Sequence, residues 1–402
     1  MSTTSLLYHA FGIAGYHVVG SEYEKGVIKF RITDNRIYRC NSCLSMNVIK
    51  RGTVTRCLRT TPIGRKPVFI ELPIQRVECC ACGSVRQVDV GFADERRSYT
   101  RAFERYVLEL SKFSTMYDVA RHLGVSWDTV KDIQMRNLER RYRHISLKDL
   151  KLIAIDEISI GKNHQYLTIV LDLNTGAIVF TNEGKGAEAL DPFWKKLKHS
   201  SAKIEAAAID MSPAYALAVK KNLPDAAIVF DHFHIIKMFN EKLAELRRDI
   251  QNEAQTMKQK RVIKGTRWLL LKASENLSGK HKKRLEEALH LNRPLALAYY
   301  MKEDLRQLWS QRDKHAASEF LDDWIARARS SGIRKLMDFS KTLASHRFGI
   351  LAWYDFPIST GPLEGTNNKI KTLIKSAYGY RDKEFLKLKL YALHEAKFKL
   401  VG

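Results

Sequence analysis

The sequence predicts a multidomain protein of mixed α/β class, and three observations lead to this prediction. All six cysteines lie within the first quarter of the 402 residues. A segment with helical spacing of its apolar residues follows, from about residue 101 to residue 144. From about residue 150 onward, short apolar strands alternate with amphipathic helices. A chain of this length normally forms two or more domains, so we expect each region to fold around its own core.

The amino-acid composition favours a folded protein that binds a polyanion. The chain has 68 Lys and Arg against 44 Asp and Glu, and the resulting net charge of +24 is typical of proteins that contact phosphates, although a merely basic surface would have the same composition. Hydrophobic residues make up 45% of the chain, which is too many for a disordered protein. No apolar run is long enough to cross a membrane, and the N-terminal segment lacks the features of a signal peptide. We therefore expect an intracellular, cytoplasmic protein.

The cysteine spacing predicts a structural zinc site in a ribbon domain over residues 1–100. Two C-x-x-C pairs, "CNSC" and "CCAC", supply the four thiolates that tetrahedral zinc requires: Cys40, Cys43, Cys79 and Cys82. The stretch between the pairs has short alternating apolar runs, which are typical of an antiparallel β-ribbon. Cys57 and Cys80 are left over, and Cys80 could replace Cys79 as a ligand. This clustering favours a metal site in a reducing compartment over disulfides.

Residues 101–148 are expected to form a helix-turn-helix DNA-binding domain. In "MYDVARHLGVSWDTVKDIQ", Ala120 suits the helix crossing, Gly124 the tight turn, and Ser126 the cap of the helix that begins at Trp127. The second helix would present four side chains outward: Trp127, Asp128, Lys131 and Gln134. Three arginines would lie close to the DNA backbone: Arg136, Arg140 and Arg141. An ordinary helical hairpin is the alternative, but the preceding zinc ribbon and the basic charge favour DNA.

The order of strands and helices from residue 149 predicts a ribonuclease-H-like core. Three strands joined by short turns come first ("KLIAIDEISI", "QYLTIVLDL" and "GAIVFTNEG"), and two further strands alternate with helices over the rest of residues 149–237. Residues 238–355 are helical, charged and almost free of strand patterns, so we expect an all-α insertion there. The α/β pattern resumes over residues 356–402, which we assign to the last part of the core.

Three acidic residues from distant positions are predicted to meet in this core. Asp156 lies on the first strand, Asp210 ends the fourth strand, and Glu364 begins the final helical segment. The first and fourth strands are neighbours in such a sheet, so the two aspartates would share one edge. Carboxylate oxygens suit Mg²⁺ or Mn²⁺, and two such ions can promote phosphodiester displacement. Asp156 and the adjacent Glu157 cannot both face the site, because successive strand side chains point to opposite faces; the alternation favours Asp156 without deciding the matter.

Several short motifs resemble those of DDE transposases from bacterial insertion sequences. The motifs are "IDE", "AIDMSPAY", "VFDHFHIIK" and "GPLEGTNNKIK" with the later "AYGYRD". They look most like the ISL3 family, whose members begin with a zinc-binding ribbon and a helix-turn-helix. The resemblance covers essentially the whole chain. It implies a ribonuclease-H-like core with a helical insertion before the glutamate, and a catalytic triad of Asp156, Asp210 and Glu364 that holds two Mg²⁺ or Mn²⁺ ions per active site.

The same resemblance points to a second group of site residues. "DHFH" is similar to a Cys-or-Asp-x-x-His element of related transposases, in which Asp231 ends the fifth strand and His234 could contact the scissile phosphate or a flipped base, or simply cap and pack under the sheet. Asn367 and Asn368 follow Glu364 by three and four residues, so one of them shares its helical face and could orient the carboxylate. Three later basic residues are candidates for contacts with the DNA backbone, a solvated helix face being the alternative: Lys371, Lys375 and Arg381.

These features lead to the hypothesis of a DNA transposase. Its N-terminal domains would bind the terminal inverted repeats of an insertion sequence, and its core would cleave the element end and transfer it to target DNA. We expect a homodimer or larger assembly on double-stranded DNA, associated with the bacterial nucleoid. The alternative is a non-catalytic DNA-binding regulator or domesticated transposase, and a structure-specific nuclease is a third hypothesis. Three acids at one edge favour the transposase, because a scaffold has no use for unpaired buried acids.

Overall fold

The protein consists of two compact units, as seen in a computed structural model that describes residues 6–34, 36–161, 165–253, 263–264, 266–272, 274–290 and 292–395. The first unit ends at Arg143, and the second comprises His144–Glu395. Each unit has its own cluster of buried apolar side chains. No helix in the described ranges is long and apolar enough to cross a membrane.

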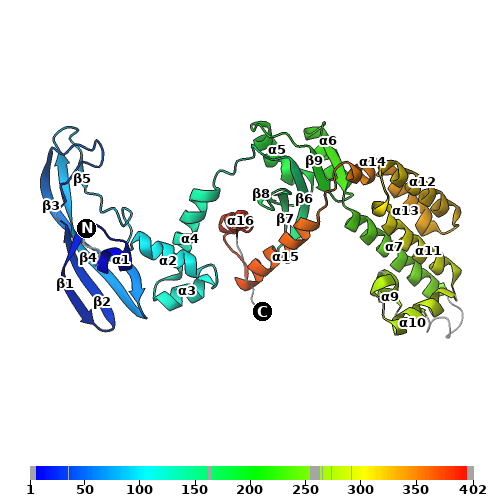
Figure 1. Cartoon of the computed structure of the whole chain (residues 1–402), viewed down its shortest axis with the longest axis horizontal. Coiled ribbons are helices and arrows are strands. Elements are labelled where there is room, and N and C mark those ends of the chain that lie inside the picture. Colours follow the sequence, from blue (N-terminus) through cyan, green and yellow to red (C-terminus); the bar gives the residue numbers. More distant parts are fainter. Residues whose placement is uncertain are drawn as a thin grey trace. The chain divides into compact units, whose positions relative to one another are not determined.

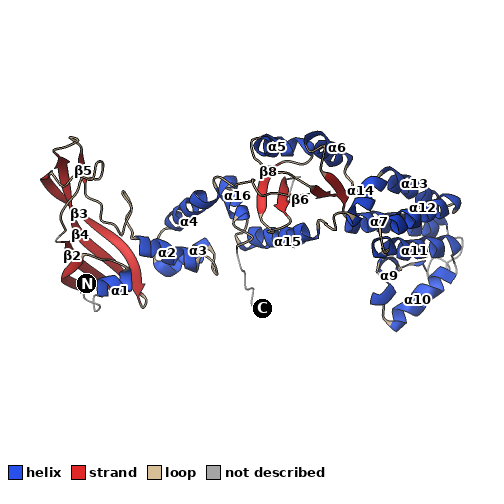
Figure 2. Ribbon diagram, turned by 45° about the horizontal axis from the view of Figure 1, so that its top comes forward, coloured by secondary structure: helices blue, strands red, loops and turns tan. Residues whose placement is uncertain are grey.

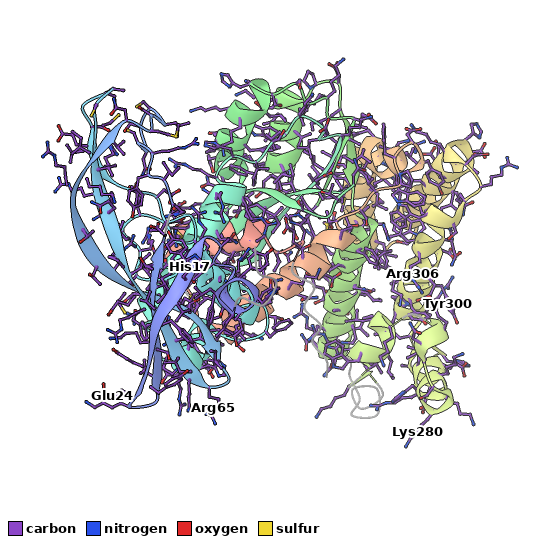
Figure 3. All side chains as sticks on the ribbon, turned by 60° about the vertical axis from the view of Figure 1, so that its left-hand side comes forward. His17, Glu24, Arg65, Lys280, Tyr300 and Arg306 are labelled. Carbon is purple, nitrogen blue, oxygen red and sulfur yellow. The ribbon has the colours of Figure 1, made fainter. Side chains whose placement is uncertain are left out.

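The first unit is built on a five-stranded sheet in which β1, β2, β4 and β3 lie in that order and β5 pairs with β4. Its strands are β1 (Tyr16–Glu24), β2 (Val27–Asp34), β3 (Val48–Ile63), β4 (Lys66–Cys79) and β5 (Val85–Gln87). β3 and β4 form a long antiparallel hairpin, whose turn carries Arg65 (Figure 3). The helix α1 (Leu6–Phe11) packs on this sheet through Leu7 and Phe11. The predicted ribbon is thus part of a larger sheet, because β2 adds the N-terminal strands to the other edge of β4.

Three helices complete the first unit and contain the helix-turn-helix. They are α2 (Arg101–Leu110), α3 (Met116–Leu123) and α4 (Trp127–Tyr142). Gly124 ends α3 with φ at 64°, a left-handed conformation that glycine adopts without a steric penalty. The Ser126 hydroxyl caps α4 by accepting a hydrogen bond of 3.1 Å from the backbone N–H of Thr129. Ala120 is buried in the core of these helices, so the predicted turn is confirmed residue by residue.

The second unit contains a five-stranded mixed sheet in the order β10-β9-β6-β7-β8. Its strands are β6 (Leu152–Ser159), β7 (Tyr166–Asp172), β8 (Ile178–Glu183), β9 (Ala206–Ile209) and β10 (Ala227–Phe230). β6, β7 and β8 are antiparallel, whereas β9 and β10 run parallel to β6. The prediction that the first and fourth strands are neighbours is therefore confirmed. Figure 2 shows α5 (Asp191–Lys198) and α6 (Pro213–Asn222) on one face of the sheet and α15 (Gly361–Ser376) on the other.

A helical segment follows β10 and packs beyond that edge of the sheet (Figure 1). Its α-helices are α7 (His232–Glu253), α9 (Arg267–Leu271), α10 (Gly279–His290), α11 (Arg293–Arg306), α12 (Lys314–Ser330), α13 (Arg334–Ser345) and α14 (Arg347–Leu351). The described part of residues 238–355 contains no strand, as expected, although α7 begins directly after β10; residues 254–262 of the predicted insertion lie outside the described ranges. Finally, α16 (Lys383–Tyr391) packs against β8.

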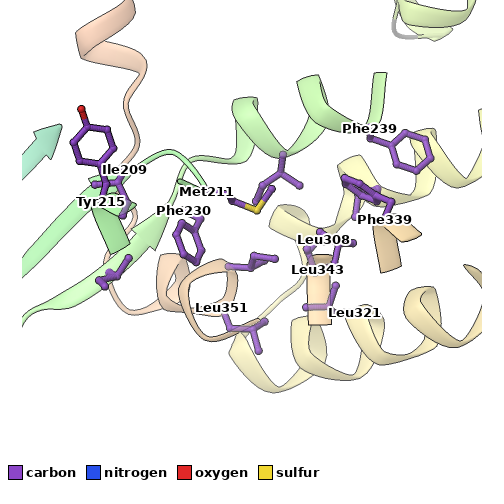
Figure 4. Packing of buried hydrophobic residues seen from close by; sticks show 14 of the residues in the cluster. Ile209, Met211, Tyr215, Phe230, Phe239, Leu308, Leu321, Phe339, Leu343 and Leu351 are labelled. Carbon is purple, nitrogen blue, oxygen red and sulfur yellow. The ribbon is translucent and has the colours of Figure 1, made fainter. Parts of the chain in front are cut away.

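The sheet and the helical segment share one hydrophobic core. Ile209 and Phe230 from the strands belong to the same buried cluster as Phe239, Phe339 and Leu343 from the helices (Figure 4). The helical segment therefore supports the ends of β9 and β10, where the acidic residues of the candidate site lie.

Candidate functional site

Three aspartates lie at one level across three neighbouring parallel strands. β6 and β9 pair with Ala154 opposite Ala208, so Asp156 and Asp210, two residues further along, lie side by side. β10 continues this register, because Phe230 pairs with Ile209 and Asp231 directly follows Phe230. In an open sheet with parallel strands, the carboxyl ends of those strands are where ligands bind.

Asp156 points to the face of the sheet that α15 covers. Its Oδ2 atom accepts a hydrogen bond of 2.9 Å from the Asn367 side-chain amide, and its Oδ1 atom accepts one of 2.8 Å from the backbone N–H of Glu157. Burial raises the pKa of Asp156, and the negative charge of Asp210 raises it further, although these hydrogen bonds and the nearby His234 act in the opposite direction. Two carboxylates in such a position repel each other, and a cation between them would relieve that repulsion.

Glu157 points to the opposite face, toward α6. Its Oε1 atom accepts hydrogen bonds from the Tyr215 hydroxyl at 2.5 Å and from the backbone N–H of Gly186 at 3.2 Å. The alternation expected for the strand is thus confirmed: Asp156 shares the edge with Asp210, and Glu157 does not. The carboxylate of Glu157 therefore has hydrogen-bond donors from within the protein, on the face of the sheet away from Asp210.

The buried Asp231 is hydrogen-bonded to both His234 and Thr360. Asp231 is 1% exposed, and its Oδ2 atom lies 2.9 Å from Nδ1 of His234 and accepts a hydrogen bond of 2.6 Å from the Thr360 hydroxyl. Burial pushes the pKa of Asp231 upward, but the hydrogen bonds from His234 and Thr360 outweigh burial and lower it. The hydrogen bond to Asp231 raises the pKa of His234, and the charges of Asp156 and Asp210 add to this effect. His234 is therefore hydrogen-bonded to Asp231 and close enough to Asp156 and Asp210 to feel their charges.

The helix α15 brings its first turns to this edge but leaves Glu364 in solvent. Glu364 lies in the first turn and is exposed. Among the residues that the structure describes, only the four clustered cysteines form a group of three or more His, Cys, Asp or Glu with ligand atoms within 4.8 Å of one another, so the two aspartates and Glu364 do not form such a group. Glu364 nevertheless shares a helical face with Asn367, whose amide contacts Asp156. The Oδ1 atom of Asn367 is buried without a hydrogen-bond partner in the described ranges.

The other predicted site residues in α15 and in the segment between α15 and α16 are exposed. They are Asn368, Lys371, Lys375 and Arg381. Lys371 and Lys375 follow Glu364 by seven and eleven residues, so they continue its face along the helix. This face is therefore acidic and amide-bearing near the aspartates and basic further away.

The four cysteines of the two C-x-x-C pairs converge at the open end of the β3–β4 hairpin. The Sγ atoms of Cys40 and Cys82 are 3.6 Å apart, and those of Cys43 and Cys79 are 3.4 Å apart. Tetrahedral zinc with Zn–S bonds of about 2.3 Å separates its sulfur ligands by about 3.8 Å, so the cluster fits this metal. Cys79 is the member of its "CC" pair that joins the cluster. Cys80 and Cys57 are free, exposed cysteines outside it.

The second helix of the helix-turn-helix exposes fewer of the predicted side chains than expected. Trp127 is 44% exposed, with Nζ of Lys131 5.6 Å from its ring centroid. The helical period predicts that Gln134 faces outward, and this prediction is wrong. Gln134 is 3% exposed and donates a hydrogen bond of 2.8 Å to the Ser111 hydroxyl, because the end of α2 covers it. Arg136 is likewise not directed at solvent, since it pairs within the protein with these residues: Asp94, Tyr99, Glu104 and Asp132.

Comparisons with known proteins identify the class of this chain. A family model of the ISL3 group, described as a transposase, matches residues 153–390, and a model of the helix-turn-helix domain of ISL3 transposases matches residues 88–136. The protein is thus a transposase with a DNA-binding helix-turn-helix. The chain belongs to the ISL3 family.

Individual relatives agree with this assignment. The chain is 31% identical to the transposase for insertion sequence element IS1001 of Bordetella parapertussis over 89% of both chains. It is 28% identical to the transposase for insertion sequence element IS1557 of Mycobacterium tuberculosis, over 87% of this chain and 84% of the relative. Among solved structures, the Drosophila P element transposase strand transfer complex covers 67% of this chain and 81% of its own at 11% identity; its TM-score of 0.34 is too low to establish a common fold.

Two features of the site were not evident from the sequence. The sequence assigns Asp231 only to the second group of site residues. Asp231 directly follows a strand, as Asp210 does, and this shared position could have indicated that the two lie at the same edge. Thr360, which donates to Asp231, precedes α15 in the chain and carries no recognisable motif. Its contact depends on packing between segments 129 positions apart.

Proposed function

We propose that this protein is the transposase of a bacterial insertion sequence, which binds the terminal inverted repeats of its element and catalyses DNA strand cleavage and strand transfer. The observation that carries the proposal is the register that sets Asp156 beside Asp210, with α15 and its Glu364 across the same face. Three antiparallel strands followed by two parallel ones also support a ribonuclease-H-like core, in which the helical segment is the insertion.

Asp156, Asp210 and Glu364 are the proposed catalytic carboxylates and would hold Mg²⁺ or Mn²⁺, two ions per active site. Bound ions of this kind supply Lewis acidity that activates the attacking oxygen and stabilises the leaving one. The repulsion within the aspartate pair and the unpartnered Oδ1 atom of Asn367 both favour a cation here. Asn367 would orient the Asp156 carboxylate through its hydrogen bond.

His234 is the proposed contact for the scissile phosphate. Its pKa is raised by its hydrogen bond with Asp231 and by the surrounding carboxylates, so the imidazole carries a positive charge at a higher pH than a free histidine. A protonated imidazole beside the aspartates would attract a phosphate into the acidic edge. Asp231 would act as a positioning residue, because the Thr360 hydroxyl and His234 together fix its carboxylate.

The first unit is proposed to bind and recognise the DNA at the element ends. Structural zinc held by the four clustered cysteines would fix the open end of the β3–β4 hairpin, and α4 would contact DNA through Trp127 and Lys131. In the second unit, three exposed basic residues would bind the DNA backbone: Lys371, Lys375 and Arg381. Transposition requires two ends to be held together, which favours a homodimer or larger assembly.

One observation favours the alternative of a non-catalytic DNA-binding regulator or domesticated transposase. Glu364 is exposed and does not lie with the two aspartates at metal-ligand distances in the described structure. In a regulator the core would be a scaffold, and substitution of the aspartates would leave its activity unchanged. The two functions therefore differ in a measurable way.

The deciding experiment compares three variants for cleavage of a duplex that carries one element end. Asp156→Asn and Asp210→Asn should each lower Mg²⁺-dependent cleavage by more than about a hundredfold, since each removes a charge that the reaction requires. Glu157→Gln is the matched control, because the adjacent acid faces α6, and it should retain cleavage. End binding should be unchanged in all three. Cleavage by Asp210→Asn at the wild-type rate would contradict the proposed active site.

A further inference from the structure

A large apolar side chain is exposed beside the aspartates, at the start of α7. Phe233 is 57% exposed, although it lies in the chain between the buried Asp231 and His234, whose imidazole is hydrogen-bonded to Asp231. Its ring edge lies against the first residue of α15, close enough that a Cβ atom on Gly361 would be 3.8 Å from Cε2 of the ring. Phe233 therefore stands where α7 and the helix that carries Glu364 meet.

The ring of Phe233 is supported by two further aromatic side chains. It packs on His232, with ring centroids 4.1 Å apart and an interplanar angle of 34°. His232 in turn packs on Trp309, with centroids 5.4 Å apart. Trp309 belongs to a 3₁₀ turn (Gln307–Ser310) of the helical segment. This row of rings holds Phe233 in place from behind while leaving more than half of it in contact with solvent.

We infer that Phe233 stacks on an unpaired base of the nucleotide next to the scissile phosphate; this inference rests on the proposed function. Every nucleic-acid base has a flat π-face, and exposed aromatic rings bind single-stranded or extruded bases by stacking on it. Consecutive residues of a helix point about 100° apart, so His234 can contact a phosphate while Phe233 contacts the base attached next to it. The helical segment then contributes to the stacking indirectly, because its Trp309 packs on His232, and His232 packs on Phe233.

The inference is tested with four variants of the full-length protein. Phe233→Ala removes the ring, Phe233→Leu keeps an apolar side chain without a π-face, and Phe233→Trp enlarges the ring. Phe348→Ala is the matched control, since Phe348 is 58% exposed in the same unit and also packs on an aromatic ring, that of Phe230. Cleavage is measured on a fully paired duplex with one element end, and on the same duplex with the bases flanking the cleavage position left unpaired.

Stacking predicts a specific order of rates. On paired DNA, the Ala and Leu variants of Phe233 should cleave about tenfold more slowly or worse, whereas the Trp variant and Phe348→Ala should stay within about threefold of wild type. On unpaired DNA the defect of Phe233→Ala should shrink, because the cost of extruding the base has been removed. A 2-aminopurine at the flanking position should change its fluorescence with wild type and not with Phe233→Ala.

Three results would overturn the inference while leaving the proposed function intact. Wild-type cleavage by Phe233→Leu would show that only apolar volume matters at this position. Wild-type cleavage by Phe233→Ala would show that the ring is not used. Phe233→Ala could instead dissociate a dimer while giving the same 2-aminopurine fluorescence change as wild type. That result would assign the ring to contact with a second copy of the chain. Failure of the wild-type protein to cleave would instead contradict the proposed function, and the stacking role with it.

Discussion

The Tyr215 hydroxyl and the backbone N–H of Gly186 both donate to Oε1 of Glu157, on the face of the sheet that α6 covers. The neighbouring Asp156 is on the other face and interacts with groups of the candidate site. Adjacent acids on one strand thus have different environments, because successive side chains point to opposite faces of the sheet. Burial raises the pKa of Tyr215, and its hydrogen bond to Glu157 raises the pKa further, so the hydroxyl keeps its proton and donates at neutral pH.

Tyr215→Phe should therefore destabilise the second unit without affecting the reaction. Removal of the hydroxyl takes one donor away from a half-buried carboxylate, which should lower the free energy of unfolding by about 1–3 kcal/mol in urea titrations. Tyr300→Phe is the control, because Tyr300 is 60% exposed, and it should change stability by less than about 0.5 kcal/mol. A loss of cleavage without a loss of stability would place Glu157 in the reaction after all.

Lys389 provides a pH-dependent contribution to stability. Burial of this side chain on α16 lowers its pKa to about 8, well below the value of about 10.4 for a free lysine. Between these two pKa values the unfolded chain binds a proton that the folded protein does not, so the free energy of unfolding should rise as the pH rises from about 8 to about 10.4. Lys389→Met should remove this rise, by about 3 kcal/mol at most, when wild type and variant are compared at both ends of the range. Lys198→Met, at an exposed position on α5, should leave the rise unchanged.

At the scale of elements, the turn of the helix-turn-helix depends on local chemistry that the sequence displays directly. Gly124 adopts a positive φ and Ser126 caps α4, as the residue types predict. Strands β6 to β10 likewise match the apolar runs that predict them. Gln134 was mispredicted for a different reason: it lies seven residues after Trp127, on the same helical face, but α2 packs over that part of the face. The helical period cannot indicate where a third helix packs.

Ser126→Ala tests whether the cap supports DNA recognition. Loss of the cap should lower the stability of the first unit by about 1 kcal/mol, since the backbone N–H of Thr129 loses its acceptor. It should also weaken binding of the element end, because Trp127 and Lys131 lie in the first turns of the same helix. Ser114→Ala, in the exposed loop before α3, should change neither quantity in thermal melts and gel-shift titrations. Unchanged DNA affinity in Ser126→Ala would indicate that α4 does not read the ends.

At the scale of the whole molecule, the sequence predicts which strands are neighbours better than it predicts which side chains meet. Asp156 and Asp210 lie together because strand order and register fix both backbones. The position of Glu364 depends on the packing of α15, which is separated from the strands in the chain by the whole helical segment. It also depends on the conformation of a side chain that is exposed. The sequence pattern predicts the helix α15 but not the rotamer of Glu364. A bound cation would attract the Glu364 carboxylate, and this attraction is not part of local helix propensity. The cysteine spacing predicts only a small ribbon, so it does not predict the N-terminal strands β1 and β2, which join the sheet through β4.

The division into two units predicts that removal of zinc affects only one of them. The four thiolates join the two ends of the β3–β4 hairpin, whereas the second unit has a separate core and its described part contains no cysteine. Chelation, or Cys40→Ser, should therefore lower the melting temperature of the first unit and weaken binding of the element end at least tenfold, because zinc binding contributes free energy to folding. Cys57→Ser is the matched control, since Cys57 lies outside the cluster on the same hairpin. Thermal melts followed by circular dichroism, with zinc content measured on the same samples, should show one transition that moves with zinc and one that does not. Wild-type protein that contains no zinc, or a chelator effect on both transitions, would contradict this assignment.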